Sequence, residues 1–236
     1  KSTTGKRDAG KRGATKGGAG KREVGKRDAG KREAVKSAAG KRGRAQRGNL
    51  DEGLRAASQA FQAGRERDAL RILQPLLDVS PEVPELRELL GLAFYRVERY
   101  AAAAKELEVF VSLTGSTEQH PVLMDCRRAQ KRHADVERLW EDLRSTAQRA
   151  PVLIEGRIVM AGSLADRGEI PKAIRLLDRG VEPKGRVQDH HARLWYALAD
   201  LEETAGNLSR ARSLFDRVRA YAPDFADATE RLAALS

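Results

Sequence analysis

Apolar residues of two sizes recur at fixed distances along residues 50–235. A glycine is followed by an alanine five residues later and by a leucine or phenylalanine four residues after that, starting at Gly64, Gly168 and Gly206. Two weaker copies of this pattern run over residues 98–107 and 134–151. Because such spacings keep the apolar positions on one face of a helix, the pattern predicts amphipathic helices rather than strands.

Glycine and proline divide these helices into pairs. A glycine favours the left-handed conformation that often ends a helix, so the three glycines above are expected to end the first helix of a pair. Proline cannot continue a helix, and Pro81, Pro151 and Pro223 are expected to follow the end of the second helix.

These landmarks resemble the tetratricopeptide repeat, a helix–turn–helix unit of 34 residues. Repeats starting at Leu50, Pro84, His120, Ile154 and Ala192 have lengths of 34, 36, 34 and 38 residues for the first four. The resemblance implies an all-α solenoid of five helix pairs, over residues 50–83, 84–119, 120–153, 154–191 and 192–225, with a capping helix over 226–235. It also implies a small residue wherever the two helices of a unit cross. These small residues are Ala57, Gly91, Ala161 and Ala199 at the eighth position, and Ala69, Ala103, Ala173 and Ala211 at the twentieth.

The third repeat departs from the pattern. Arg127 stands where a small residue is expected, and Leu139 replaces the alanine of the second helix. This unit is therefore expected either to splay or to have its register shifted by about a turn. Two inserts are also expected, around residues 114–119 and 181–189.

The resemblance further implies a concave binding surface lined by the first helices of the units. From the family's groove positions, the partner-binding residues are expected to be Leu54, Ser58, Phe61, Gln62, Glu88, Leu92, Tyr95, Arg96, Arg128, Lys131, Arg132, Ile158, Tyr196, Asp200 and Glu203. The basic residues in the middle of this set suggest a protein segment that carries acidic residues. The alternative is that these positions form an ordinary solvated helix face.

Charge divides the chain differently. Residues 1–48 hold 17 Lys and Arg against 4 acidic residues, a net charge of +13, whereas residues 49–236 have a net charge of −2. Lysine recurs every five residues from Lys1 to Lys41, and the only apolar residues before position 49 are eight alanines and two valines. Such a segment has almost nothing to bury, so residues 1–48 are predicted to be disordered.

This basic tail suggests binding to a polyanion. A polycation binds nucleic-acid phosphates through counterion release, without reading the sequence. Because no aromatic residue is interleaved, stacking on bases is not expected. The alternative is a solubilising extension that binds nothing in particular. The tail residues expected to contact a polyanion are Lys6, Arg7, Lys11, Arg12, Lys21, Arg22, Lys26, Arg27, Lys31, Arg32, Lys41 and Arg42.

The sequence gives little support to catalysis. It contains no phosphate-binding loop and no signature of a metalloprotease or serine hydrolase, so no catalytic residue, cofactor or metal ion is expected. The adjacent His190 and His191 point about 100° apart on a helix and lack further ligands nearby. Cys126 is expected to be a core residue, and one cysteine without a disulfide partner fits the reducing cytoplasm. No apolar run is long enough to span a membrane.

The sequence therefore predicts a non-enzymatic scaffold or adaptor that binds a protein partner, with a composition similar to that of uncharacterised bacterial repeat proteins. The alternative is an accessory factor that associates with nucleic acid or the ribosome through its basic tail.

Overall fold

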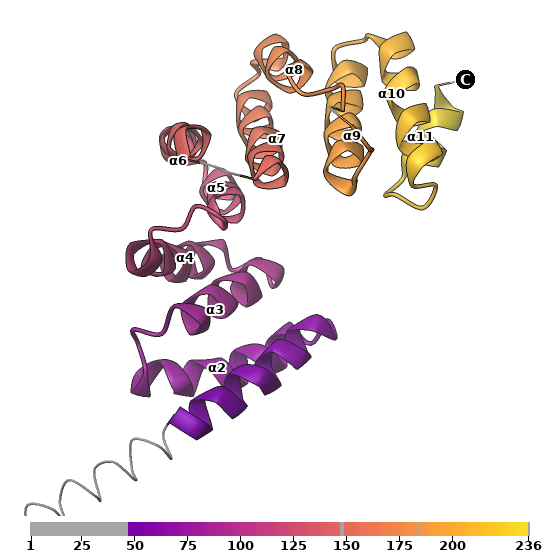
Figure 1. The fold of residues 1–236 in the computed structure, drawn as a ribbon. Coiled ribbons are helices and arrows are strands. Elements are labelled where there is room, and N and C mark those ends of the chain that lie inside the picture. The colour runs from indigo at the N-terminus through magenta and orange to yellow at the C-terminus, as the bar shows by residue number, and fades with distance from the viewer. Residues whose placement is uncertain (1–46, 147–148, 184, 236) are drawn as a thin grey trace, which may run out of the picture. The chain divides into compact units, whose positions relative to one another are not determined.

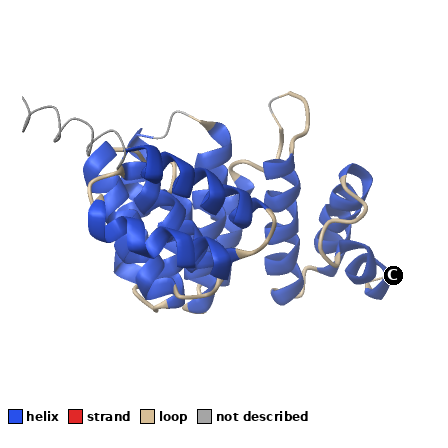
Figure 2. Cartoon of the chain, turned by 90° about the horizontal axis from the view of Figure 1, so that it is seen from below, coloured by secondary structure: helices blue, strands red, loops and turns tan. Residues whose placement is uncertain are grey.

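The computed structural model describes residues 47–146, 149–183 and 185–235, so most of the predicted basic tail lies outside the described residues. The chain divides into two units, Lys1–Asp51 and Glu52–Ser236. The described residues form eleven helices and no strand (Figures 1 and 2). The first helix is described over residues 47–62. The others are α2 (Glu66–Val79), α3 (Pro84–Arg96), α4 (Tyr100–Thr114), α5 (His120–Ala129), α6 (His133–Thr146), α7 (Ala150–Asp166), α8 (Ile170–Asp178), α9 (Asp189–Thr204), α10 (Leu208–Tyr221) and α11 (Ala228–Ala234).

The helices pack in chain order as a solenoid. Helix α3 lies against α4, α5 against α6, α7 against α8 and α9 against α10, each pair joined by a short turn. Neighbouring pairs also touch, because α4 packs on α5, α6 on α7 and α8 on α9. The first helices α5, α7 and α9 lie side by side (Figure 1). The all-α solenoid predicted from the sequence is thus confirmed, with α11 as the capping helix.

One turn geometry joins the two helices of every unit. Gly64, Gly168 and Gly206 have φ angles of 69°, 77° and 81°, as the sequence predicted. Glu98 and Lys131 take the same place in the second and third units, with φ angles of 60° and 59°. After each left-handed residue, the next backbone N–H donates to the carbonyl oxygen five residues earlier, the bond of a Schellman motif. These N···O distances are 2.8–2.9 Å, to Ala60, Phe94, Arg127, Leu164 and Glu202.

Small residues allow the paired helices to approach closely. At Gly91 of α3, an added Cβ atom would lie 2.6 Å from Cγ of Leu107 and 3.4 Å from the carbonyl oxygen of Ala103, both on α4. Ala57 and Ala69 in the first unit are fully buried. A side chain larger than alanine at these crossings would push the helices apart or force neighbouring side chains out of their rotamers.

The shared turn fixes the register of the third unit. In the other units, the two crossing residues lie seven positions before and five positions after the left-handed residue. The same count from Lys131 gives Met124 and Val136, and both are fully buried. The expected crossing at Arg127 and Leu139 is therefore wrong by three residues, and the register is shifted rather than splayed. The sequence left a splayed unit and a shifted register open, because Lys131 occupies the place of the glycine that marks the turn in three other units.

The apolar core has two parts, and buried polar side chains occur among the helices that form it. One part includes residues from Ala57 to Cys126, and the other includes residues from Met124 to Leu232. Near the boundary, the Arg127 guanidinium pairs with Glu108 and donates to Gln130 at 3.1 Å, and Glu106 pairs with Arg87. These polar partners allow the Arg127 side chain to be buried. Arg127 does not occupy the apolar crossing between the two helices.

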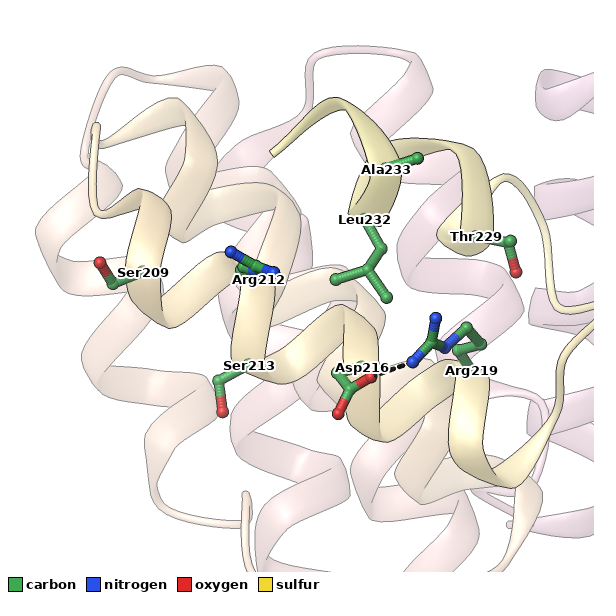
Figure 3. A pocket seen from close by; sticks show the side chains of 8 residues that line it. All are labelled: Ser209, Arg212, Ser213, Asp216, Arg219, Thr229, Leu232 and Ala233. Atoms are coloured by element: carbon green, nitrogen blue, oxygen red, sulfur yellow. Dashed lines mark hydrogen bonds and ion pairs between the residues drawn. The ribbon is translucent and has the colours of Figure 1, made fainter. Parts of the chain in front are cut away.

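The outer face of the last helix pair is polar. Ser209, Arg212, Ser213 and Asp216 are exposed on α10, and Asp216 pairs with Arg219 at 2.6 Å (Figure 3). Leu232 of α11 points into the pocket between the two helices and is buried. Capping units of repeat arrays carry a polar outer face of this kind.

The left-handed residues allow a direct test of backbone strain. Glu98 is exposed and would lose its steric penalty on replacement by glycine, so Glu98→Gly should raise the free energy of unfolding by about 1 kcal/mol. Gly64→Ala should lower it by about 1 kcal/mol, because the added Cβ meets nothing within 4 Å and the cost falls on the backbone alone. Urea unfolding followed by circular dichroism measures both. Equal signs for the two changes would contradict the turn assignment.

Candidate partner-binding groove

The N-terminal part of the predicted groove is held by contacts between the first and second units. The Arg96 guanidinium lies 4.5 Å from the centroid of the Phe61 ring, and its Nη1 is 3.3 Å from Oε1 of Glu66. Glu88 accepts a hydrogen bond of 2.7 Å from Gln119. These three predicted groove residues thus already have partners within the chain.

Tyr95 connects the second unit to the third. Its hydroxyl donates to Oδ2 of Asp125 at 2.7 Å. Burial raises the pKa of Tyr95, and the hydrogen bond to Asp125 raises it further, so the phenol stays protonated and remains a donor. Asp125 was not among the residues expected in the groove.

Arg128 lies at the centre of the groove, and its guanidinium contacts two aspartates. Its Nε and Nη2 contact the two carboxylate oxygens of Asp166 at 2.7 and 3.3 Å, and its Nη1 lies 3.2 Å from Oδ1 of Asp125. Gly162 makes room for this side chain, because an added Cβ would lie 3.0 Å from Cζ of Arg128. The hydrogen bond to Asp166 raises the pKa of Arg128. The cation is therefore held between two carboxylates.

The C-terminal part of the groove has a similar arrangement. Arg231 of α11 contacts Asp200 at 2.8 Å and Glu203 at 2.7 Å, both on α9. The same guanidinium lies 5.7 Å from the ring centroid of Tyr196, whose hydroxyl donates to Asp227. Tyr196 and Asp200 therefore both lie close to the guanidinium of Arg231.

Lys131 and Arg132 do not lie on a first helix. Lys131 is the left-handed residue of the turn, and Arg132 pairs with Asp135 of α6 at 2.5 Å. With the corrected register, the groove positions of the third unit are instead Asp125 and Arg128 together with Ala129. Asp166 could have been found from the sequence, because it occupies the thirteenth position of the fourth predicted repeat. Finding Asp125 required the register shift.

A pocket lies on the first helices where these side chains meet. It has a volume of about 390 Å³ and lies on α5, α7 and α9, with one residue from α8. We call it the groove pocket. Its lining residues are Asp125, Arg128, Ile158, Val159, Ala161, Gly162, Ala165, Asp166, Leu177, Ala197, Asp200 and Leu201. We call its half-buried apolar side chains, those of Ile158, Val159, Ala165 and Ala197, the floor of the groove pocket. Among its carboxylates, Asp166 and Asp200 are exposed and Asp125 is half-buried.

The nucleophilic side chains near these helices are structural. Ser163 is fully buried and its hydroxyl lies 2.8 Å from Nδ1 of His133, a geometry that links two units but gives no substrate access. Cys126 is also buried, as the sequence predicted, and burial raises the pKa of its thiol to about 12, so the thiol is not activated. Over the described residues, no group of three or more potential ligand side chains is arranged to hold a metal ion.

The two adjacent histidines belong to a helix start. Nδ1 of His191 accepts a hydrogen bond of 3.0 Å from the backbone of Gln188, which is half of a capping box for α9. Burial lowers the pKa of His190, and His191 lowers it further, so His190 is neutral at pH 7. Capping explains His191 without a metal.

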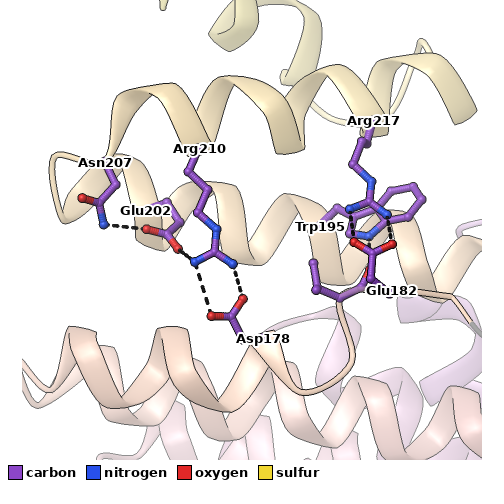
Figure 4. Close-up of polar contacts among 8 residues, drawn as sticks. Asp178, Glu182, Trp195, Glu202, Asn207, Arg210 and Arg217 are labelled. Carbon is purple, nitrogen blue, oxygen red and sulfur yellow. Dashed lines mark hydrogen bonds and ion pairs between the residues drawn. The ribbon is translucent and has the colours of Figure 1, made fainter.

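An ionic network around the buried Glu202 joins α9 to α10, and its Arg210–Asp178 pair also joins the fifth unit to the fourth (Figure 4). Glu202 accepts hydrogen bonds of 2.7 Å from both Asn207 and Arg210, and Arg210 also reaches Asp178. Nearby, Arg217 lies 4.3 Å from the ring centroid of Trp195 and pairs with Glu182 at 2.9 Å. This network positions α9, and with it one wall of the groove pocket.

Comparison with known proteins identifies the family. The model of the tetratricopeptide repeat matches residues 54–114, 159–225 and 196–235, and the chain belongs to this family. The unmatched stretch between residues 114 and 159 contains α5 and α6, the unit whose register is shifted. A search among curated proteins finds no match.

Solved structures of bacterial repeat proteins share the fold. A thermophilic TPR protein of Thermus thermophilus is 21% identical, with a TM-score of 0.61 over 78% of this chain and 97% of that one. A tetratricopeptide repeat protein of Parabacteroides merdae is 19% identical, with a TM-score of 0.59 over 78% of this chain and 69% of that one. PilF of Pseudomonas aeruginosa is 14% identical, with a TM-score of 0.56 over 80% and 90%. At these identities the likeness concerns the fold alone.

The buried network predicts a large stability difference between two glutamates. Glu202→Ala should lower the free energy of unfolding by about 2 kcal/mol, because it removes the buried acceptor of Asn207 and Arg210 and opens a cavity. Glu182→Ala removes a carboxylate that is 75% exposed and should lower the free energy of unfolding much less. Urea unfolding measures both variants. Similar losses would show that Glu202 does not stabilise the packing of α10 on α9.

Proposed function

We propose that this chain is a non-enzymatic scaffold or adaptor that binds a segment of a partner protein in the groove pocket. Tetratricopeptide repeat proteins generally act as such scaffolds, since their stacked helix pairs form extended concave surfaces. The observation that carries the proposal is the uncovered apolar floor of the groove pocket on α7 and α9. Ile158, Val159 and Ala197 line this cavity of about 390 Å³, and each of them is only half-buried.

Several features support binding over catalysis. Ser163 and Cys126 are fully buried, and the pKa of the thiol is raised rather than lowered. The polar groups of the groove pocket form ion pairs with one another, and they do not form a pair of a nucleophile and its base.

Over the part of the chain described by the structure, every helix is too short or too polar to cross a membrane. The free thiol of Cys126 supports our proposal of a cytoplasmic location.

A steric block tests the role of the groove pocket. Ala197→Arg places a long side chain over the apolar floor, whereas Ala220→Arg makes the same change at an exposed position of α10. Partners captured by proximity labelling in cells should be lost with Ala197→Arg and retained with Ala220→Arg. Thermal melting monitors the folding of both variants. A partner set unchanged by Ala197→Arg in a folded chain would exclude the groove pocket as the binding site.

The second candidate function is association with nucleic acid or the ribosome through the basic tail. The observation in its favour is the net charge of +13 on residues 1–48, nearly all of which lie outside the described residues. Lysines and arginines such as Lys6, Arg7, Lys41 and Arg42 would neutralise phosphates without sequence readout. The scaffold proposal does not depend on this tail.

Deletion of residues 1–46 tests this candidate. The full chain should bind a labelled DNA duplex with an affinity that falls by at least tenfold between about 50 and 200 mM salt, because bound counterions are released. The deletion should abolish this binding. Fluorescence anisotropy measures both, and binding that survives the deletion would assign the affinity to the repeat domain.

A further inference from the structure

The groove pocket is acidic, although basic residues were expected in the middle of the groove. Three aspartates and one arginine line it, so its net charge is −2. The arginine, Arg128, is already shared by Asp125 and Asp166. Arg96 is likewise paired with Glu66, and Arg132 is paired outside the groove. An acidic ligand would compete with these carboxylates for the guanidinium groups and would add negative charge to a pocket that already has an excess of it.

The exposed carboxylates are placed to meet a cation. The side chain of Asp200 is 51% exposed, and that of Asp166 is 38% exposed. Asp200 contacts Arg231 through Oδ1, and among the described residues no hydrogen bond to its Oδ2 is observed. An incoming ammonium or guanidinium group could therefore bind at Asp200 without displacing Arg231. Desolvation of such a pair by an apolar neighbour strengthens the interaction.

The floor of the groove pocket supplies that apolar neighbour. Ala165 and Ala197 are small and half-buried, and Ile158 lies beside them. Such a surface suits small aliphatic side chains and the methylene stem of a lysine or arginine, which packs on apolar atoms while its charged end stays in water. The pocket thus combines a narrow apolar surface with carboxylates at its edge.

We propose that the partner segment bound in the groove pocket is cationic, with lysine or arginine side chains that contact Asp200 and Asp166 and small aliphatic side chains that cover the floor. This inference rests on the proposed scaffold function and names the chemistry of its ligand. It reverses the acidic ligand that the isolated sequence suggested.

Two synthetic peptides test the charge preference on the full chain. They are fluorescein-labelled dodecapeptides of identical alanine and leucine content, one carrying three lysines and the other three glutamates. Fluorescence anisotropy should show binding of the lysine peptide and at least tenfold weaker binding of the glutamate peptide. Binding in the groove pocket is the part of the signal that Ala197→Arg abolishes, since the basic tail of residues 1–48 can also attract the glutamate peptide. In that part of the signal, equal affinity, a preference for the glutamate peptide, or no binding of the lysine peptide up to about 1 mM would overturn the proposal.

A matched pair of substitutions locates the contact. Asp200→Asn removes one carboxylate from the groove pocket, and Asp216→Asn makes the same change in an exposed, arginine-paired aspartate of α10. The affinity for the lysine peptide should fall about fivefold with Asp200→Asn and stay unchanged with Asp216→Asn. Equal losses would show that only the overall charge matters and would also overturn the proposal.

The steric variant separates this inference from the scaffold function. If Ala197→Arg abolishes partner capture in cells while the glutamate peptide binds better than the lysine peptide, the scaffold function holds and the cationic ligand is wrong. If Ala197→Arg changes neither partner capture nor peptide binding, the groove pocket is not the binding site and both proposals fail.

Discussion

The Schellman turn between the two helices of each unit is the constraint on which this solenoid depends. A left-handed residue and one backbone hydrogen bond reverse the chain at the same point in all five units. Because the turn is short and its geometry is fixed, it also fixes which residues of the two helices face each other. The crossing at Gly91 and Ala103, and its equivalents in the other units, follows from the turn.

The groove pocket follows from the same constraint. Once each pair is closed, the first helices α5, α7 and α9 lie side by side and leave one face of each uncovered. Small residues such as Gly162 and Ala197 on that face keep the pocket open, and Gly162 specifically makes room for Arg128. A stable, repetitive backbone thus presents a surface whose chemistry depends on a few side chains.

Ion pairs between successive units decide the charge of that surface. Arg96 contacts Glu66, Arg128 contacts Asp166, and Arg231 contacts Asp200, each about one repeat apart along the chain. Such exposed or half-exposed pairs contribute little stability individually. Their larger effect is on recognition, since they neutralise the arginines of the groove and leave an excess of carboxylates.

The sequence by itself determined the helix pairs, the small residues at their crossings and the turns at Gly64, Gly168 and Gly206, because local conformation and helical spacing are read from neighbouring residues. Tertiary structure alone decided the register around Lys131, since a non-glycine residue adopts the left-handed conformation only where packing requires it. It also decided that Arg128 is paired, because its partner Asp166 is 38 residues away in sequence and is brought near only when α5 packs on α7.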